Sequence, residues 1–205
     1  MRTSGSAPNP RPRLAAGPRG SGRHEIRIIG GQWRRSRLQV PDKPGLRPTP
    51  DRVRETLFNW LGQDMSGWRC VDAFAGTGVL GLEAASRGAA QVLAFEQDAQ
   101  LVALLQEHAR RLQASTLRVQ RGDALAAMGQ LPAQTFDLVF LDPPFDSAMF
   151  ADALQSAARL VPPGGWIYLE APRLWLTEEL AIHQLSLYKH LKAGAVHAHL
   201  LKRAA

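Results

Sequence analysis

The sequence lacks several features that would assign it to whole classes of protein. Its single cysteine, Cys70, cannot form an internal disulfide, which fits a reducing, cytoplasmic location. It has no run of eighteen or more apolar residues, so no membrane-spanning segment is expected. The basic N-terminus is not followed by the apolar stretch of a secretory signal. His183, His190, His197 and His199 lack the spacing of metal ligands, so no metal is expected.

Acidic residues are scarce in the first quarter of the chain. Residues 1–54 contain 13 Lys and Arg against 3 Asp and Glu, whereas the remainder contains 12 against 15. This asymmetry indicates a polyanion-binding arm joined to a nearly neutral body. Residues 1–24, which are rich in Pro, Gly, Ser and Arg, are expected to form a disordered basic tail. The alternative is a solvated tail whose charge only aids solubility.

Residues 25–50 are expected to form a β-hairpin and an extended, proline-rich connector. Residues 26–29 and 32–40 have the composition of two short strands, and Gly30-Gly31 lies between them as a turn. Arginines that contact phosphate and an aromatic that stacks suit structured RNA. The residues predicted to bind RNA are Arg27, Trp33, Arg34, Arg35, Arg37 and Arg47. The alternative is a hairpin that packs on the body with its arginines solvated.

Residues 51–205 are expected to form one catalytic domain. Asp51 is expected to cap a helix with one apolar face, and strands then alternate with helices, which predicts a parallel sheet covered on both faces. A closing hairpin about Ala193-Gly194 adds one antiparallel strand. Strands are predicted at 70–74, 92–96, 117–122, 136–141, 166–170, 186–191 and 196–202, and helices at 78–88, 99–112 and 150–160.

A glycine loop joins the first strand of this domain to its helix. Gly76, Gly78 and Gly81 fit the G-x-G-x-x-G spacing of dinucleotide enzymes, so a nicotinamide or flavin enzyme is one interpretation. Asp72, just before the loop, favours another, because its charge would repel a pyrophosphate but stabilise the ammonium and sulfonium of S-adenosylmethionine. The residues predicted to bind this cofactor are Asp72, Phe74, Gly76, Thr77, Gly78, Glu96, Gln97, Asp123 and Ala124.

Two of these acids follow later strands. Glu96 could accept hydrogen bonds from the ribose hydroxyls, and Asp123 could accept one from the adenine amine. Because successive parallel strands end at the same edge of a sheet, the acids at 72, 96 and 123 are expected to lie around one crevice. Each acid by itself could instead be a helix cap or part of a solvated loop.

The catalytic prediction rests on Asp142, Pro143, Pro144 and Phe145, which follow a strongly apolar strand. The Asp142 carboxylate and the Pro143 carbonyl could accept the two N–H groups of an exocyclic base amine and free its lone pair for attack. The prolines would make these acceptors rigid, and Phe145 would stack on a flipped base. A proline-stiffened turn without a catalytic role is the alternative.

Three segments together are similar to the bacterial 16S rRNA guanine-N2 methyltransferases, the RsmD family. They are residues 47–61 (RPTPDRVRETLFNWL), 72–78 (DAFAGTG) and 142–145 (DPPF), and the first is the most specific. The resemblance covers residues 26–203. It implies a Rossmann-like class I methyltransferase with a mostly parallel seven-stranded sheet, S-adenosylmethionine as cofactor, and a guanine of 16S rRNA within a partly assembled small subunit as substrate. The extension before Ile26 departs from the family core.

Other interpretations remain beside this one. An adenine-N6 methyltransferase of DNA or RNA shares the Asp-Pro-Pro-Phe segment, but 205 residues leave little room for a target-recognition domain. A non-catalytic RNA-binding assembly factor is a second alternative, which the intact glycine loop and Asp142 disfavour. The protein is expected to act as a monomer. Arg52 and Arg54 could pair with Asp51 and Glu55 or approach the cofactor.

Overall fold

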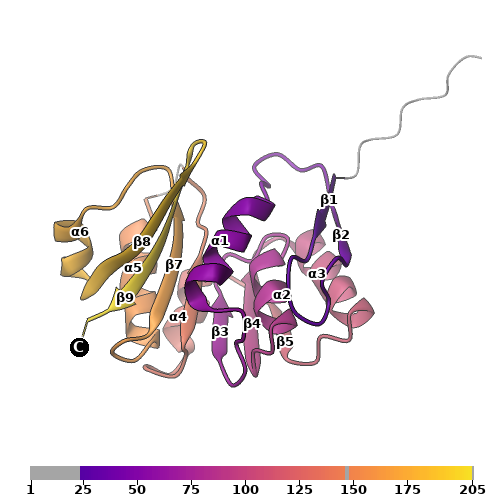
Figure 1. Ribbon diagram of the computed structural model, residues 1–205, viewed down its shortest axis with the longest axis horizontal. Coiled ribbons are helices and arrows are strands. Elements are labelled where there is room, and N and C mark those ends of the chain that lie inside the picture. Colours follow the sequence, from indigo (N-terminus) through magenta and orange to yellow (C-terminus); the bar gives the residue numbers. More distant parts are fainter. Residues whose placement is uncertain (1–23, 146–147, 205) are drawn as a thin grey trace, which may run out of the picture.

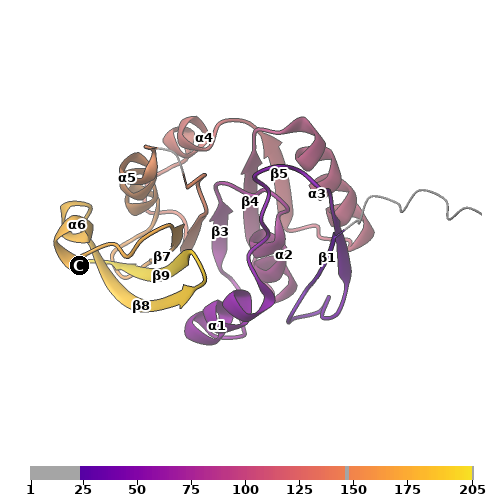
Figure 2. The ribbon, with the colours of Figure 1, turned by 90° about the horizontal axis from the view of Figure 1, so that it is seen from above.

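The computed structural model describes residues 24–145 and 148–204, which form a two-stranded hairpin and a seven-stranded sheet with helices on both faces (Figures 1 and 2). The disordered tail predicted for residues 1–24 falls almost entirely outside these residues. The strands are β1 (His24–Arg27), β2 (Arg37–Val40), β3 (Arg69–Asp72), β4 (Gln91–Glu96), β5 (Leu117–Arg121), β6 (Leu138–Leu141), β7 (Trp166–Ala171), β8 (Leu185–Ala193) and β9 (Val196–Arg203). The helices are α1 (Asp51–Leu61), α2 (Val79–Ser86), α3 (Ala99–Arg111), α4 (Ala124–Gln130), α5 (Phe150–Leu160) and α6 (Thr177–Ile182).

The large sheet has the strand order β5-β4-β3-β6-β7-β9-β8. The ladders from β5 to β7 are parallel, and β9 pairs antiparallel with both β7 and β8. The chain reverses its direction of winding between β5 and β6, so the switch point lies where β3 and β6 are neighbours. In sheets of this kind ligands bind beyond the carboxyl ends of the strands at that point. The prediction of seven mostly parallel strands is confirmed.

Each face of the sheet packs against its own apolar core. One core joins α1, α2 and Leu105 of α3 to the face that carries Phe140 and Tyr168. The other joins α4, α5 and α6 to the face that carries Val139 and Leu169. Figure 2 shows α1 and α2 on one side of the sheet and α4 and α5 on the other. All four residues of β6 are buried, as its unbroken apolar sequence predicted for a strand covered on both faces.

The N-terminal hairpin is present, but its second strand is shorter than predicted. β2 begins at Arg37 rather than at residue 32, because the chain from Gly31 to Arg35 turns and docks on the end of α2. Gln32 donates its backbone N–H to the Ser86 carbonyl at 2.8 Å. A Cβ at Gly31, where φ is +75°, would lie 1.9 Å from that carbonyl oxygen, so glycine is required there.

Two further sequence expectations are wrong. Asp51 does not cap α1: Pro50 is the N-cap residue, no side chain caps the helix, and Asp51 instead binds Arg54 and Arg27. The short helices α4 and α6 were not predicted, because 7 and 6 residues are too few to show a clear helical period. Within the described residues, no helix is both long and apolar enough to cross a bilayer.

Candidate active site at the carboxyl edge of the sheet

The glycine loop lies at the carboxyl end of β3, between the strand and α2. Gly78 is the N-cap residue of α2 with φ of +72°, and a Cβ there would lie 2.2 Å from Leu105. Glycine therefore lets α3 pack closely against the loop. Thr77 is buried, and the Gly76 N–H donates to Glu96 at 2.8 Å. The loop predicted to cradle a ligand thus lies between β3, α2 and α3.

Asp72 is buried beneath this loop at the end of β3, 2% exposed, and one of its oxygens accepts the Gly81 N–H at 2.9 Å. Burial raises the pKa of Asp72 to about 7, and the charges of Glu96 and Glu170 also raise it, against the hydrogen bond from Gly81. No basic side chain is among the groups that shift it. A cationic ligand above the loop would therefore be stabilised by this carboxylate.

Glu96 and Asp123 lie where the sequence placed them, at the ends of β4 and β5. Glu96 is half-buried and accepts the backbone N–H groups of Gly76 and Asp98, both at 2.8 Å. Each oxygen keeps a second lone pair, so acceptance from a ribose hydroxyl remains open. Asp123 is exposed, caps α4 through the Ala126 N–H at 2.8 Å, and accepts from the Gln97 amide at 2.7 Å. Asp123 is therefore the N-cap residue of α4, and this role does not depend on a ligand.

Asp142 follows β6 directly and is half-buried. Within the described part of the chain, no donor is hydrogen-bonded to its carboxylate. Burial raises the pKa of Asp142 well above its ordinary value, and the charges of Glu170 and Asp72 raise it further. Pro143 is buried, Pro144 is exposed and Phe145 is half-buried. The predicted motif thus presents a carboxylate with free lone pairs and an accessible aromatic ring at the switch point.

Sequence reasoning missed a third acid of this group, Glu170. In the parallel register Leu141 faces Leu169, so Asp142 and Glu170 are the next positions on neighbouring strands. Glu170 is 3% exposed and accepts the Thr49 hydroxyl at 2.6 Å and the Tyr168 hydroxyl at 2.9 Å. Burial raises its pKa, and these two hydrogen bonds partly offset the rise. The position of Glu170 at the end of a predicted strand was the feature of the sequence that could have indicated this acid.

The connector between the hairpin and α1 crosses this same edge of the sheet. Lys43 forms an ion pair with Asp98, which follows β4. Leu46 passes over the glycine loop, 3.5 Å from where a Gly76 Cβ would lie. Thr49 then reaches Glu170 on β7. The connector therefore lies along the edge of the sheet that carries the predicted site residues, a placement that its proline-rich sequence did not reveal.

The arm is fastened to the body by a buried network of charges. Arg54 is fully buried and donates to the Thr49 carbonyl at 3.1 Å and the Arg27 carbonyl at 2.8 Å. It also pairs with Glu83 of α2 and with Asp51, and Glu83 pairs in turn with Arg87. The sequence left open whether Arg54 pairs with Asp51 and Glu55 or approaches the cofactor. Arg54 pairs with Asp51, and its second partner is Glu83 and not Glu55.

The five arginines predicted to bind RNA fall into two groups, and Trp33 differs from both. Arg34, Arg35 and Arg47 are exposed, and no described acid forms an ion pair with them. Arg27 and Arg37 are also exposed but pair with Asp51 and Glu25, at 3.3 and 3.0 Å. Trp33 is half-buried and packs against the core, which favours a structural role for this residue over base stacking.

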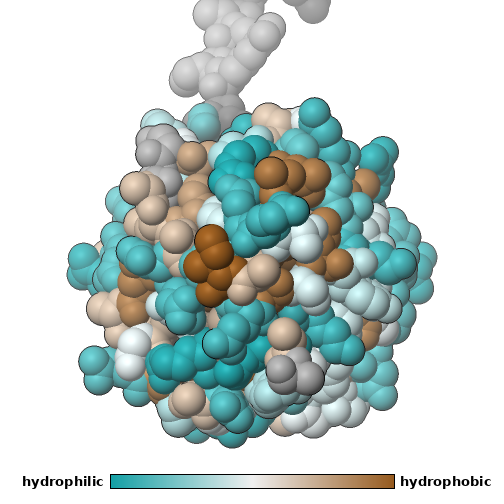
Figure 3. All heavy atoms as spheres, turned by 90° about the vertical axis from the view of Figure 1, so that its left-hand side faces the viewer, coloured by the Kyte–Doolittle hydropathy of each residue, from teal (hydrophilic) through white to brown (hydrophobic). Residues whose placement is uncertain are grey.

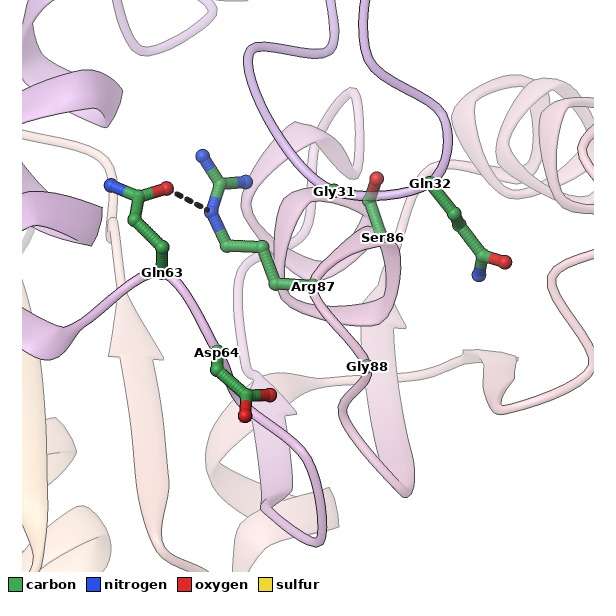
Figure 4. Close-up of a pocket in the computed structure, with 7 residues that line it drawn as sticks. All are labelled: Gly31, Gln32, Gln63, Asp64, Ser86, Arg87 and Gly88. Carbon is green, nitrogen blue, oxygen red and sulfur yellow. Dashed lines mark hydrogen bonds between the residues drawn. The ribbon is translucent and has the colours of Figure 1, made fainter.

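A cavity of about 410 Å³ lies at the amino ends of β3 and β4, away from the carboxyl edge of the sheet. Figure 4 shows it between the arm's turn at Gly31 and Gln32, the loop at Gln63 and Asp64, and the end of α2. Arg87 lines it, but its guanidinium is already bound to Glu83 and donates to Gln63 at 3.4 Å. The cavity therefore brings together none of the predicted site residues.

Comparisons with known proteins agree with this geometry. The family model described as "Conserved hypothetical protein 95" matches residues 26–202. The chain is 45% identical over 154 residues to Ribosomal RNA small subunit methyltransferase D of Escherichia coli K12, covering 75% of each chain. It is 40% identical to the Haemophilus influenzae protein of the same name, over 73% of this chain and 80% of that one. The solved structure of the Escherichia coli protein yhhF covers 89% of this chain and 99% of that one, with a TM-score of 0.75 and 35% identity.

The strand order, the glycine loop after β3 and the Asp-Pro-Pro-Phe segment after β6 define a class I S-adenosylmethionine-dependent methyltransferase. The matched family model and the curated relatives narrow this class to one group. The chain belongs to the RsmD family of small-subunit rRNA methyltransferases, as its three sequence segments predicted.

Proposed function

We propose that this protein transfers a methyl group from S-adenosylmethionine to the exocyclic N2 amine of a guanine in small-subunit rRNA. The observation that carries the proposal is the juxtaposition of Asp142 and Phe145 with Asp72 and the glycine loop at one switch point. The curated relatives that the chain resembles at 45% and 40% identity are named as methyltransferases of small-subunit rRNA. We further propose that the target guanine lies in 16S rRNA within a partly assembled small subunit. In this proposal the enzyme acts as a monomer in the cytoplasm.

The donor set fits the cofactor. Asp72, Glu96 and Glu170 are acids around the crevice, and no basic side chain is among the groups that shift the pKa of Asp72 or Glu170. S-adenosylmethionine supplies an electrophilic methyl group on a sulfonium and carries a second positive charge on its ammonium. In this proposal Asp72 stabilises the cationic end through the loop, and Glu96 accepts the ribose hydroxyls. A pyrophosphate would meet the same carboxylates unfavourably, which argues against a dinucleotide cofactor.

Asp142 and Pro143 would prepare the nucleophile. Their oxygens accept the two N–H groups of the amine, so the nitrogen lone pair is withdrawn from the ring and directed outward. As the nitrogen bonds the methyl carbon, the methyl–sulfur bond would break and its electron pair would stay on sulfur as a neutral thioether. The methylated amine would then lose one proton, which the Asp142 carboxylate is placed to accept. Burial and two neighbouring acids raise the pKa of Asp142 in the free protein, and a bound sulfonium would lower it again, so that the ionised carboxylate meets the amine. Phe145 would hold the flipped base by stacking.

The test is to incubate the purified protein with labelled methyl donor and small subunits from a strain that lacks it. We expect one labelled guanine, modified at N2, and no requirement for a metal, since the proposed steps need no Lewis acid. Transfer to adenine N6 would favour the first alternative. Tight subunit binding without any transfer would favour the non-catalytic assembly factor. Loss of transfer in the presence of a chelator would show that a metal takes part.

A further inference from the structure

The β8–β9 hairpin is a second basic element, separate from the N-terminal arm. From residue 185 to the end of the chain there are three lysines, one arginine and three histidines, and no acidic residue. Residues 55–205 as a whole carry more acids than bases, so positive charge is concentrated in this hairpin. A one-sided charge of this kind favours a polyanionic partner.

The register places one end of the hairpin at the catalytic edge. β9 runs antiparallel to β7, and Ala171 at the end of β7 faces His197 near the start of β9. The turn at Gly194 therefore stands beside the edge where Asp142 follows β6, and it rises at the top of Figure 1. Lys202 lies at the other end of the same strand, because it faces Trp166 at the beginning of β7.

Three donors gather near the turn. His190 Nε2 and His197 Nδ1 are 3.0 Å apart, and the two rings stack with centroids at 5.1 Å. Lys192 faces His197 in the β8–β9 register and is exposed. Both histidines are half-buried, so their outer edges remain accessible.

His199, the third histidine of the hairpin, differs because the fold uses both of its ring nitrogens. The Trp175 N–H donates to Nε2 at 3.2 Å, and Nδ1 bonds the Leu169 carbonyl at 3.2 Å. His199 is therefore a structural residue. The pair beside it is not tied to the backbone in this way, and its only hydrogen bond within the described residues is the one between the two rings.

We infer that Lys192, His190 and His197 bind a phosphate of the substrate rRNA, on the opposite side of the target nucleotide from the N-terminal arm. This inference rests on the proposed function. An ammonium and the two outer N–H groups that the histidine pair presents once it has gained a proton are donors suited to phosphate oxygens. No acid of the hairpin competes for them. Two basic hairpins would then flank the catalytic edge and fix the orientation of the RNA over Asp142.

A protein partner is a poorer match for this face. Among all described residues, the exposed large apolar ones are Leu174, Leu176, Ile182 and Tyr188. Figure 3, which views the molecule from this side, shows the brown apolar groups divided by teal polar ones. An extensive protein interface needs a more continuous apolar centre than this.

Phosphate binding by the histidines predicts a pH dependence. In the free protein, burial lowers the pKa of His190, and the charges of His197 and Lys192 lower it further. Other titratable groups near α6 are already bound: Glu179 pairs with Arg173, and His183 contacts Gln155. Helix α1 contacts β8 from the other face of the sheet. A bound phosphate favours the protonated imidazole, so binding takes up protons and affinity rises as the pH falls.

The experiment measures direct binding of the full chain to 16S rRNA and to small subunits over roughly 50–200 mM salt. Lys192→Ala should weaken binding several-fold and reduce the slope of log affinity against log salt by about one, since one phosphate contact is lost. Lys202→Ala is the matched control, a lysine of the same hairpin at the opposite edge, and should leave the slope unchanged. The double variant H190Q/H197Q should bind with less pH dependence than wild type between pH 6 and 8.

An unchanged salt slope in Lys192→Ala would overturn the inference. Weaker binding to subunits with unaltered binding to naked rRNA would also overturn it and assign the hairpin to a ribosomal protein. Failure of the proposed function gives a different result, because wild-type protein would then bind RNA without methylating it. Methylation measured in parallel, with a raised KM for subunits and an unchanged affinity for S-adenosylmethionine in Lys192→Ala, separates the two failures.

Discussion

The buried acid Glu83 and the acids at the carboxyl edge of the sheet have opposite electrostatic surroundings. Glu83 is fully buried between two buried arginines, Arg54 and Arg87, and also accepts the Ile29 N–H at 2.7 Å. Asp72, Asp142 and Glu170 share one edge of the sheet, and no basic side chain is among the groups that shift their pKa values. Glu83, whose charge is neutralised by two arginines, stabilises the fold. A group of acids without basic partners is instead suited to bind a cation.

This difference follows from what each place has to do. The arm must stay attached to the body, and Glu83 satisfies the backbone N–H groups of Ile29 and Gly30 at the junction. In the proposed function the carboxyl edge of the sheet holds a ligand with a sulfonium and an ammonium, and acids without arginine partners suit such a ligand.

The largest effect is expected on chemistry at Asp142. Asp142→Ala should lower the single-turnover rate of methyl transfer by on the order of 100-fold or more, because the amine loses an acceptor that acts in the transition state. Asp142→Asn should be milder, since an amide oxygen still accepts one N–H. Rapid-quench methylation of small subunits measures both rates. A wild-type rate in Asp142→Ala would remove Asp142 from the catalytic centre.

On the neutralised side, Glu83→Gln should destabilise the fold. The buried guanidinium of Arg87 would lose its counter-charge and that of Arg54 would keep Asp51 alone, and breaking a buried ion pair in this way costs about 3–5 kcal/mol. Urea unfolding measures the free energy of unfolding. Glu179→Gln is the control, because the exposed pair of Glu179 with Arg173 should contribute little. Equal stabilities of the two variants would contradict the structural role of Glu83.

On the unneutralised side, Asp72→Asn should weaken cofactor binding and yet stabilise the free protein. The folded-state pKa of Asp72 is about 7, above its unfolded value, so the folded state binds more protons and loses stability as pH rises towards 7. Removing the charge should restore on the order of 1–4 kcal/mol at pH 8, while an amide still accepts the Gly81 N–H. Thermal unfolding at pH 5 and 8 checks this. Destabilisation at pH 8 would mean that the charge is already neutralised.

The smallest effect is expected at the exposed arginines of the arm. Replacing Arg34, Arg35 and Arg47 with Ala should flatten the salt dependence of RNA binding, because fewer counterions are released. Stability and cofactor affinity should hardly change. Arg37→Ala is a useful comparison, since Arg37 already pairs with Glu25. If Arg37→Ala flattens the slope as much as the triple variant does, ion pairing within the arm does not decide which arginines bind phosphate.

The sequence predicted those parts of the molecule whose signal is local. The apolar run of β6, the glycines before α2 and the acids at the ends of β3 and β4 can each be recognised within a few residues. The hydrogen bond between Thr49 and Glu170 joins residues 121 positions apart, and the ion pair between Arg54 and Glu83 joins residues 29 apart. Such pairings depend on the folded topology, so Glu170 and the role of the connector emerged only from the structure.

The start of β2 is a further feature that local sequence does not determine. Residues 32–36 have strand-like composition, yet the Trp33 ring packs on the core and Ser86 accepts the Gln32 N–H, so tertiary contacts turn the chain. Asp51 was a reasonable cap by its residue type, but two arginines offer its carboxylate a better partner than a backbone N–H. At both of these positions tertiary contacts outweigh local propensity.

The most direct test of the central claim is calorimetry of S-adenosylmethionine binding near pH 7 in buffers of different ionisation enthalpy. A cation bound beside Asp72, Asp142 and Glu170 lowers their raised pKa values, so wild-type protein should release protons on binding. Its affinity should increase with pH up to a plateau above about pH 7. Asp72→Asn should release fewer protons and bind more weakly. The claim that these acids bind a cation would be contradicted by binding that releases no protons. In that case the affinity would also be independent of pH and unaffected by Asp72→Asn.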